Sequence, residues 1–421
     1  AAQALDRLEN VDNNPSRRVA IVGAGYAGMA AAVTLAGKGA RVTVFESAPV
    51  PGGRARRVTT QGRELDNGQH ILIGAYTELL RLMEIVGTPE DALLRVPLEL
   101  RYADGFAFRS LWLPAPFGLL MGLLLTWKFP FSERLRAIAF MNDLGRKAYR
   151  VEANLSVKDL LEKHRQNGAI GHYLWRPLCV SALNTPVEMA SAQVFVNVLR
   201  DSLAGDARAS DLLLPRVDLS RLFPEPACEF ILKRGGQLKT GTPVKELESL
   251  RKEFDSVIVA VGPHQLKALL PELALEYPYQ PIYTCYLQYP ANVQLRFPML
   301  GFSGGLVQWA FDRGRLTGEP GRIACVISAQ GDHQQMTHEE LAANCHRELK
   351  AARPQLPDPE WTQVIAEKRA TVACVPGMKA VNVEMKSIIL AGDYTYPDYP
   401  PTLEAAVRSG VRAAGLALRA P

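Results

Sequence analysis

The chain has 421 residues, which exceeds the usual size of one hydrophobic core and favours two lobes. Apolar residues make up 48% and charged residues 22%, and the net charge of +5 is too small to indicate a nucleic-acid partner. Six cysteines are scattered without metal-binding or disulfide spacing, so we expect no metal site and buried thiols in a reducing, cytoplasmic compartment. Residues 1–16 are expected to form a flexible leader.

The first predicted element is a buried parallel strand over residues 19–22, because most of these residues are β-branched. Three glycines follow at G-x-G-x-x-G spacing: Gly23, Gly25 and Gly28. An alanine-rich run then predicts a helix over residues 29–38. The first glycine allows a tight turn, the second lets a pyrophosphate approach, and the third packs the helix on the strand. The N-terminus of the helix would face the phosphates.

A second predicted strand, residues 41–45, ends at Glu46, eighteen residues after Gly28. A carboxylate at this point accepts hydrogen bonds from a ribose 2′-hydroxyl and disfavours a 2′-phosphate. The glycine pattern alone is weak, since a turn without a ligand can have the same sequence. Because strand, helix, second strand and acid are in register, the sequence predicts a dinucleotide site.

Two further glycine turns follow this unit. Gly52, Gly53 and Arg54 offer backbone N–H groups and a cation to a phosphate, although a basic surface turn would have the same residues. Residues 65–73 are predicted to form a strand entered through a glycine turn, and they contain an Asp-x-Gly-x-His pattern that ends at His70.

Together these separated turns resemble the flavin-containing amine oxidase and phytoene desaturase superfamily. The resemblance implies FAD as the cofactor and an α/β fold, with a Rossmann-like FAD-binding domain, discontinuous in sequence, joined to a substrate domain of mixed sheet and helices. It also implies that the Gly-Gly-Arg segment lies by the pyrophosphate and that the segment around Gly68 runs under the isoalloxazine. The implied bounds are 17–75, 226–268 and 383–421 for the FAD-binding domain, and 76–225 and 269–382 for the substrate-binding domain.

The most apolar stretch of the chain covers residues 111–127. Its seventeen residues include two prolines near the start, and about ten continuous apolar residues are too few to span a bilayer core of about 30 Å. Three interpretations stay open: a buried core helix, an in-plane membrane element and the lip of an apolar substrate channel. Peripheral contact with the inner face of a membrane is therefore one expectation.

Residues 151–222 are expected to be mainly helical. Five short segments carry a finer resemblance, at 175–178, 182–186, 190–192, 198–201 and 219–223. They are similar to the squalene-associated branch of the superfamily, the bacterial hydroxysqualene dehydroxylases of hopanoid biosynthesis. This resemblance covers nearly the whole chain and implies that reduced FAD converts hydroxysqualene, a long isoprenoid, to squalene.

The second half of the chain predicts further elements of both domains. Residues 235–247 have strand-turn-strand character, and residues 255–263 form a buried strand closed by Gly-Pro. Residues 271–382 predict an antiparallel sheet with one helix over 337–352. The chain then closes with a buried strand, a Gly-Asp turn and a helix that starts near Thr402.

The predicted site residues follow from these turns and from the resemblance. A carboxylate at a strand end can bind sugar hydroxyls, and the N-terminus of the last helix offers positive potential to a reduced flavin. The predicted cofactor contacts are Gly23, Gly25, Tyr26, Ala27, Gly28, Glu46, Ser47, Gly53, Arg54, Gly68, Gln69, His70, Val244, Ala260, Gly262, Gly392, Asp393 and Leu403. His70 is also the candidate general acid, although a lone histidine is more often a structural hydrogen-bond donor.

FAD chemistry leaves three reactions open: amine oxidation, polyene desaturation and reductive removal of an allylic hydroxyl. An amine oxidase usually places aromatic rings beside the flavin, but residues 400–403 contain none directly before the last helix. Tyr394, Tyr396 and Tyr399 lie a few residues earlier, where packing is favoured over channel lining. A flavin-bearing scaffold without turnover is disfavoured by the intact glycine turns and carboxylates.

Overall fold

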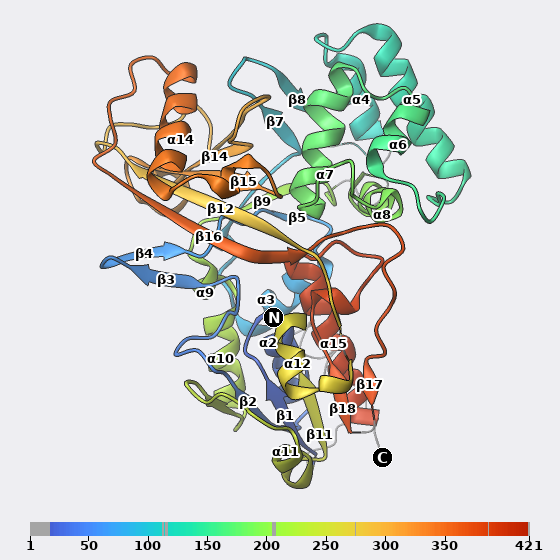
Figure 1. Ribbon diagram of the computed structural model, residues 1–421, viewed down its shortest axis with the longest axis vertical. Helices are drawn as coiled ribbons and strands as arrows, with labels where there is room; N and C mark the ends of the chain where they lie inside the picture. Colours follow the sequence, from blue (N-terminus) through green and yellow to red (C-terminus); the bar gives the residue numbers. More distant parts are fainter. Residues whose placement is uncertain are drawn as a thin grey trace.

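The computed structural model describes residues 17–111, 113, 117–203, 208–273, 275–385 and 387–419, so the expected leader lies outside the described residues. Figure 1 shows an elongated molecule with a six-stranded sheet at one end and a five-stranded sheet beside a group of helices at the other. The fold is α/β, as predicted.

The six-stranded sheet has the order β10-β2-β1-β11-β18-β17. Its strands are β1 (Arg18–Val22), β2 (Arg41–Phe45), β10 (Gln237–Lys239), β11 (Ser256–Val259), β17 (Glu384–Met385) and β18 (Ile388–Leu390). All neighbours are parallel except β17, which pairs with β18 in the antiparallel sense. Three distant parts of the chain therefore build one sheet, whose central strands are apolar because both faces are covered.

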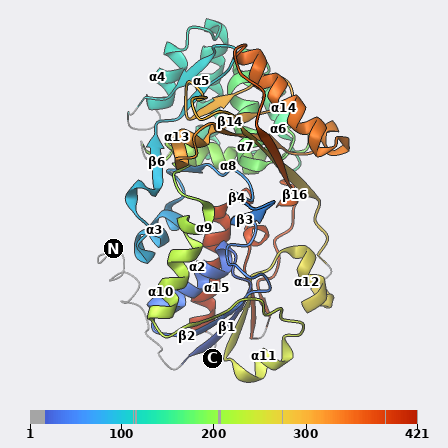
Figure 2. The same ribbon diagram turned by 90° about the vertical axis from the view of Figure 1, so that its left-hand side faces the viewer.

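Helices cover both faces of this sheet. One face carries α2 (Tyr26–Gly37), α3 (Thr77–Val86), α10 (Pro224–Lys233) and α15 (Leu403–Arg419), and the other carries α11 (Glu248–Glu253) and α12 (Pro263–Leu269). Figure 2 shows α2 between α10 and α15. Helix α2 is buried along its whole length, which its alanines permit. It starts three residues before the predicted start, because Gly25 is already its N-cap.

The second sheet is antiparallel, as predicted, with the order β13-β14-β15-β12-β16. Its strands are β12 (Tyr279–Gln288), β13 (Met299–Gly301), β14 (Trp309–Asp312), β15 (Arg322–Ser328) and β16 (Trp361–Val372). Helix α14 (His338–Ala352) packs on one face, and the short helix α13 (Arg313–Thr317) follows β14. Thr337 caps α14 in a capping box with Glu340, so the helix begins one residue after the predicted start.

The remaining helices lie over the other face of this sheet, as Figure 1 shows. They are α4 (Phe117–Leu125), α5 (Phe131–Arg146), α6 (Val157–Lys163), α7 (Arg176–Leu183) and α8 (Ala192–Leu203). The short helix α9 (Leu219–Leu222) belongs instead to the same core as α2. Short strands pair as β3–β4 (Arg57–Thr60, Arg63–Asp66), β5–β9–β6 (Leu72–Ile73, Leu212–Pro215, Leu93–Val96) and β7–β8 (Glu99–Arg101, Ala107–Arg109). No helix in the described ranges is long and apolar enough to cross a membrane.

Two strand predictions need correction. Residues 65–73 do not form one strand, because β4 ends at Asp66, Gly68 takes a φ of +127°, and β5 begins only at Leu72. Residues 235–247 contain β10 but no second strand among the described residues. The proposed domain bounds stay a prediction.

Candidate active site

The G-x-G-x-x-G turn is built so that only glycine fits at two of its positions. Gly23 has a φ of +102°, and a Cβ there would lie 2.6 Å from the carbonyl oxygen of Ala260. A Cβ on Gly28 would lie 1.9 Å from the carbonyl oxygen of Gly23. Helix α2 starts directly behind this turn, and neither a capping side chain nor an acid occupies its first turn. The N-terminus of α2 is therefore free to take a phosphate.

Glu46 lies at the end of β2, beside this turn. Its carboxylate accepts a hydrogen bond of 2.7 Å from the N–H of Ala24 and another of 2.7 Å from the N–H of Ala48, and the Ser47 hydroxyl lies within 3.3 Å. The N–H of Thr242 bonds the carbonyl oxygen of Glu46 at 2.8 Å, which brings the segment with Val244 to the same end of the sheet. The acid and the glycine turn are thus held as one unit.

The Gly-Gly-Arg segment lies against the glycine turn. Gly52 donates its N–H to the carbonyl oxygen of Ala24 at 2.8 Å, and a Cβ on Gly53 would lie 3.0 Å from the Cα of Gly25. Arg54 reaches across to Asp393, with 2.8 Å between guanidinium nitrogen and carboxylate oxygen. The Asp393 charge raises the pKa of Arg54 further above its ordinary value.

The last strand of the sheet delivers Asp393 to this place. Gly392 follows β18 and donates its N–H to the Ser409 hydroxyl of α15 at 2.8 Å. Ala260 and Gly262 lie at the end of the neighbouring β11, and Leu403 is the first residue of α15. Strand ends that are far apart in sequence therefore converge, as expected for a site at the carboxyl edge of a parallel sheet.

This geometry fits FAD. The turn is too tight for side chains at Gly23 and Gly28, the N-terminus of α2 carries no competing acid, and a cation and a buried carboxylate flank it. The Tyr26 side chain is an exception among the predicted contacts, because its hydroxyl donates to the carbonyl oxygen of Leu219 and its ring packs against Phe223. Any contact of Tyr26 with a ligand must come from its backbone.

The segment with His70 is fixed by a buried charge network that the sequence did not predict. Asp66 accepts a hydrogen bond of 2.8 Å from the N–H of Leu219 and lies 3.2 Å from the guanidinium of Arg313. Arg313 also donates to the side-chain oxygen of Gln69 at 3.1 Å and pairs with Glu319 at 2.8 Å. Burial raises the pKa of Asp66 to about 6, and the charge of Arg313 limits that rise.

His70 and Thr284 face the same space beside Gly68. The Nε2 atom of His70 lies 3.8 Å, and the Oγ1 atom of Thr284 4.0 Å, from the point where a Cβ on Gly68 would stand. Burial and the nearby charge of Arg54 lower the pKa of His70 to about 4, so its ring is neutral at neutral pH. The hydroxyl of Thr284 is buried and has no hydrogen-bond partner among the described residues.

Arg313 and Thr284 left no local signal in the sequence. Each stands in an ordinary strand or helix context, and the contacts that matter join positions far apart, such as the 244 residues between Arg313 and Gln69. The alternation of side-chain direction along β12 indicates only that Thr284 faces the same side of the sheet as Ile282 and Tyr286.

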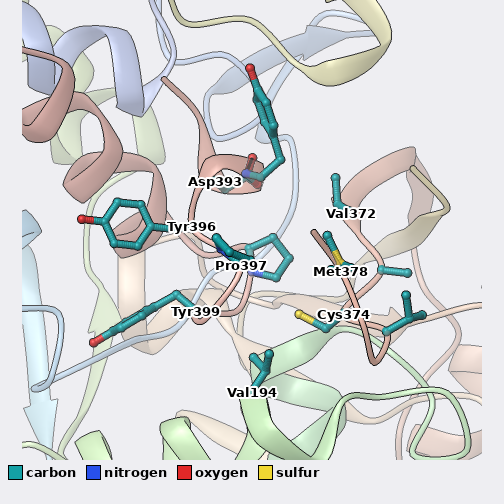
Figure 3. A pocket seen from close by; sticks show the side chains of 12 residues that line it. Val194, Val372, Cys374, Met378, Asp393, Tyr396, Pro397 and Tyr399 are labelled. Atoms are coloured by element: carbon teal, nitrogen blue, oxygen red, sulfur yellow. Dashed lines mark hydrogen bonds between the residues drawn. The ribbon is translucent and has the colours of Figure 1, made fainter. Parts of the chain in front are cut away.

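Two pockets adjoin the turn between β18 and α15. Figure 3 shows the first, of about 310 Å³, with Asp393 above it, Tyr396 and Tyr399 on one side, and Met378 and Cys374 on the other. The second, of about 420 Å³, shares Tyr399 with the first. Its other lining residues are Ile73, Ala75, Tyr76, Ala182, Asn197, Val198, Asp201, Asp398, Pro400 and Thr402. This second pocket therefore reaches the N-terminus of α15 through a largely apolar lining.

The tyrosines of this turn are already engaged. The Tyr394 ring is buried under the six-stranded sheet, and the Tyr399 hydroxyl donates to Asp201 at 2.7 Å. The guanidinium of Arg408 lies 4.9 Å from the centre of the Tyr399 ring, and that of Arg412 lies 4.5 Å from the centre of the Tyr396 ring. The rings of Tyr396 and Tyr399 already contact cations of the protein, which disfavours these two rings as a binding site for an ammonium substrate.

A family model described as flavin containing amine oxidoreductase matches residues 26–418 of the chain. The match begins within the glycine turn and extends into α15, so it includes the five-stranded sheet, every strand of the six-stranded sheet except β1, and both pockets.

Individual proteins are similar over nearly their whole length. The hydroxysqualene dehydroxylase of Rhodopseudomonas palustris is 28% identical over 428 residues, which cover 96% of this chain and 99% of that protein. A protein of Synechococcus elongatus named probable zeta-carotene desaturase is 25% identical, covering 96% and 99%. The crystal structure of an oxidoreductase from Methanosarcina mazei has a TM-score of 0.69 at 17% identity, covering 95% of this chain and 100% of that one. This last similarity concerns the fold alone.

Proposed function

The chain belongs to the family of flavin-containing amine oxidoreductases, and we propose that within this family it removes the allylic hydroxyl of hydroxysqualene to give squalene. The full-length similarity to a hydroxysqualene dehydroxylase supports this substrate. The apolar pocket at the N-terminus of α15 carries the assignment, because a long hydrocarbon needs an apolar space beside the flavin.

Different predicted contacts would hold different parts of FAD. The start of α2 would take the pyrophosphate, Glu46 would take the ribose, and Arg54 and Asp393 would take a phosphate and the ribityl chain. Reduced FAD, when bound, would supply the hydride that replaces the hydroxyl, and the hydroxyl would take up a proton and leave as water. The protein itself must bind the hydrocarbon, orient the hydroxyl and exclude water that would recapture an allylic cation.

His70 and Thr284 are the groups that would orient the departing hydroxyl. Both face the space beside Gly68, which the resemblance places under the isoalloxazine. Because the pKa of His70 is about 4, the ring acts as a neutral N–H donor at neutral pH, and only a small imidazolium fraction is available as a general acid. The hydroxyl of Thr284 has no hydrogen-bond partner among the described residues, so it would be the second group that bonds the departing hydroxyl.

Turnover of the flavin tests the reaction. Protein reduced with dithionite in the absence of oxygen should be reoxidised by hydroxysqualene, with squalene as the lipid product. Bleaching of oxidised protein by a carotene, with a more unsaturated carotene as the product, would favour the desaturase, the second candidate, because a zeta-carotene desaturase is also similar over nearly the whole chain. Bleaching of oxidised protein by a simple amine would contradict the assignment.

Two variants test the hydroxyl site. Thr284→Val keeps the shape of the side chain, and His70→Ala removes the ring; each should lower kcat/KM for hydroxysqualene by about tenfold or more through one lost hydrogen bond. A neutral N–H donor predicts a rate that is level above about pH 5, whereas imidazolium catalysis predicts a tenfold fall per pH unit. Full turnover of pre-reduced His70→Ala protein would exclude a role for His70.

We also propose that the protein is cytoplasmic and contacts the inner face of a membrane peripherally, since its substrate is soluble in lipid rather than in water. The six cysteines, all among the described residues, are free thiols, which supports a reducing compartment. Of the three interpretations of residues 111–127, the in-plane membrane element would provide this contact.

A further inference from the structure

Exposed apolar side chains gather on one part of the molecule. In the described part of the chain, most of the large apolar side chains that are exposed lie between residues 113 and 135. They are Leu113 (38% exposed), Leu125 (62%), Trp127 (80%), Phe131 (65%) and Leu135 (48%). These side chains, before α4, at its end, in the turn after it and on the first turns of α5, form what we name the α4–α5 surface. Figure 1 places α4 and α5 at the end of the molecule opposite β1 and β2.

The turn that presents Trp127 is held in place by hydrogen bonds to its carbonyl groups and by one buried side chain. The guanidinium of Arg134 donates to the carbonyl oxygens of Leu124 at 2.7 Å, Phe129 at 2.7 Å and Trp127 at 3.0 Å. Phe129 is fully buried, with its ring 5.1 Å from that of Phe106. The alternation of buried Phe129 with exposed Trp127 and Phe131 is therefore a feature of the fold and not of a frayed end.

The charges around this surface are positive on its outer side. Lys128 and Arg136 are exposed. The one acid between residues 117 and 136 is Glu133, and its carboxylate is turned inward, where it accepts the N–H of Ile170 at 3.0 Å. Asp104, an exposed acid on a neighbouring loop, is engaged by the hydroxyls of Tyr173 and Ser303, and the ammonium of Lys128 donates to the carbonyl oxygen of the adjacent Gly105 at 2.8 Å. An apolar surface with outward cations and an inward acid complements an anionic lipid surface.

We propose that the α4–α5 surface docks on the interface of an anionic bilayer. Leu125, Trp127 and Phe131 would enter the boundary between head groups and acyl chains, where tryptophan is favoured. Lys128 and Arg136 would lie beside lipid phosphates. The exposed apolar side chains and the charges support docking independently of the reaction. Only the purpose of the surface, which is to receive an isoprenoid from the bilayer, rests on the proposed function.

Vesicle flotation with purified full-length protein tests the docking. Vesicles of phosphatidylcholine with phosphatidylglycerol should bind the protein more tightly than phosphatidylcholine alone, and added salt should weaken the binding. The variant Leu125→Ser/Trp127→Ser/Phe131→Ser should bind at least about tenfold more weakly. Its three side chains are exposed, so its unfolding midpoint should match that of the wild type.

The chain offers matched controls and a charge variant. Val50 and Leu232 are also exposed apolar side chains, but they lie outside the α4–α5 surface, so Val50→Ser/Leu232→Ser should bind vesicles like the wild type. Lys128→Glu/Arg136→Glu should lose the preference for the anionic lipid while keeping weak binding to phosphatidylcholine.

Three outcomes would overturn the docking proposal. The first is unchanged vesicle binding by the triple serine variant, and the second is an equal loss in the Val50→Ser/Leu232→Ser control. The third is a wild-type dimer in solution that the triple variant converts to a monomer, which would make this surface an interface between copies of the chain. Dehydroxylation of hydroxysqualene in detergent micelles is a separate readout: its failure would contradict the proposed function and leave vesicle binding unaffected.

Discussion

Replacing Arg313 by methionine should destabilise the protein by an amount that grows with pH. Arg313 is 4% exposed and lies 3.2 Å from the carboxylate of Asp66. Burial raises the pKa of Asp66 from its ordinary value of 3.8 to about 6. The stability that a raised pKa contributes is present below pH 3.8 and is lost as the pH rises through 6. Without Arg313, the charge that limits this rise is lost, so the pKa of Asp66 should rise further.

The magnitude follows from this shift. At about pH 5, Asp66 is protonated in both folded proteins, so the two differ only by the lost hydrogen bonds of Arg313, about 1–3 kcal/mol. At about pH 7, Asp66 is mostly ionised in the wild type, and a larger fraction of it stays protonated in Arg313→Met. Each pH unit by which the pKa of Asp66 rises in the variant lowers its free energy of unfolding at this pH by about 1.4 kcal/mol. The destabilisation by Arg313→Met should therefore be larger at pH 7 than at pH 5, by about 1.4 kcal/mol for each such unit.

Urea denaturation followed by tryptophan fluorescence at the two pH values measures this difference. Arg322→Met is the matched control, because Arg322 pairs with Glu319 but not with Asp66; its effect should be the same at both pH values. Adding Asp66→Asn to Arg313→Met should remove the pH dependence. Equal destabilisation by Arg313→Met at pH 5 and pH 7 would refute the coupling between Arg313 and Asp66.

Gly28→Ala should abolish FAD binding, seen as colourless purified protein, because its Cβ would lie 1.9 Å from a backbone oxygen, whereas Gly145→Ala on α5 has open space and should stay yellow. His70→Gln should make the FAD-free protein less sensitive to acid. The lowered pKa of His70 contributes stability that is present above pH 6.5 and is lost as the pH falls through about 4. The thermal unfolding midpoint of the variant should therefore fall less than that of the wild type across this pH range. Glu404→Gln should cost about 1–3 kcal/mol in urea denaturation, because the fully buried carboxylate accepts the N–H of Leu79 at the start of α3; an unchanged midpoint would show that this tertiary cap contributes nothing.

The sequence by itself determined the elements whose causes are local. The β-branched run, the glycine turn and the alanine-rich helix are neighbours in the chain, so their backbone preferences predicted β1, α2 and β2 with Glu46 at the end. The helix predicted over residues 337–352 was likewise correct to within one residue, and the capping box at Thr337 is its local physical cause. Spacing could not show that Gly25 is already the N-cap of α2, because helix ends depend on the packing of the first turn.

Only the tertiary structure decided which distant residues meet. The network of Asp66, Gln69 and Arg313 joins the segment before His70 to α13, and neither end carries a local pattern that points to the other. The same holds for Trp127. An apolar run indicates that much of a segment will be buried, but which of its side chains are buried depends on the elements packed against it. Backbone preference acts between neighbours in the chain, whereas burial and charge pairing act between neighbours in space, and the candidate site is built mainly from the latter.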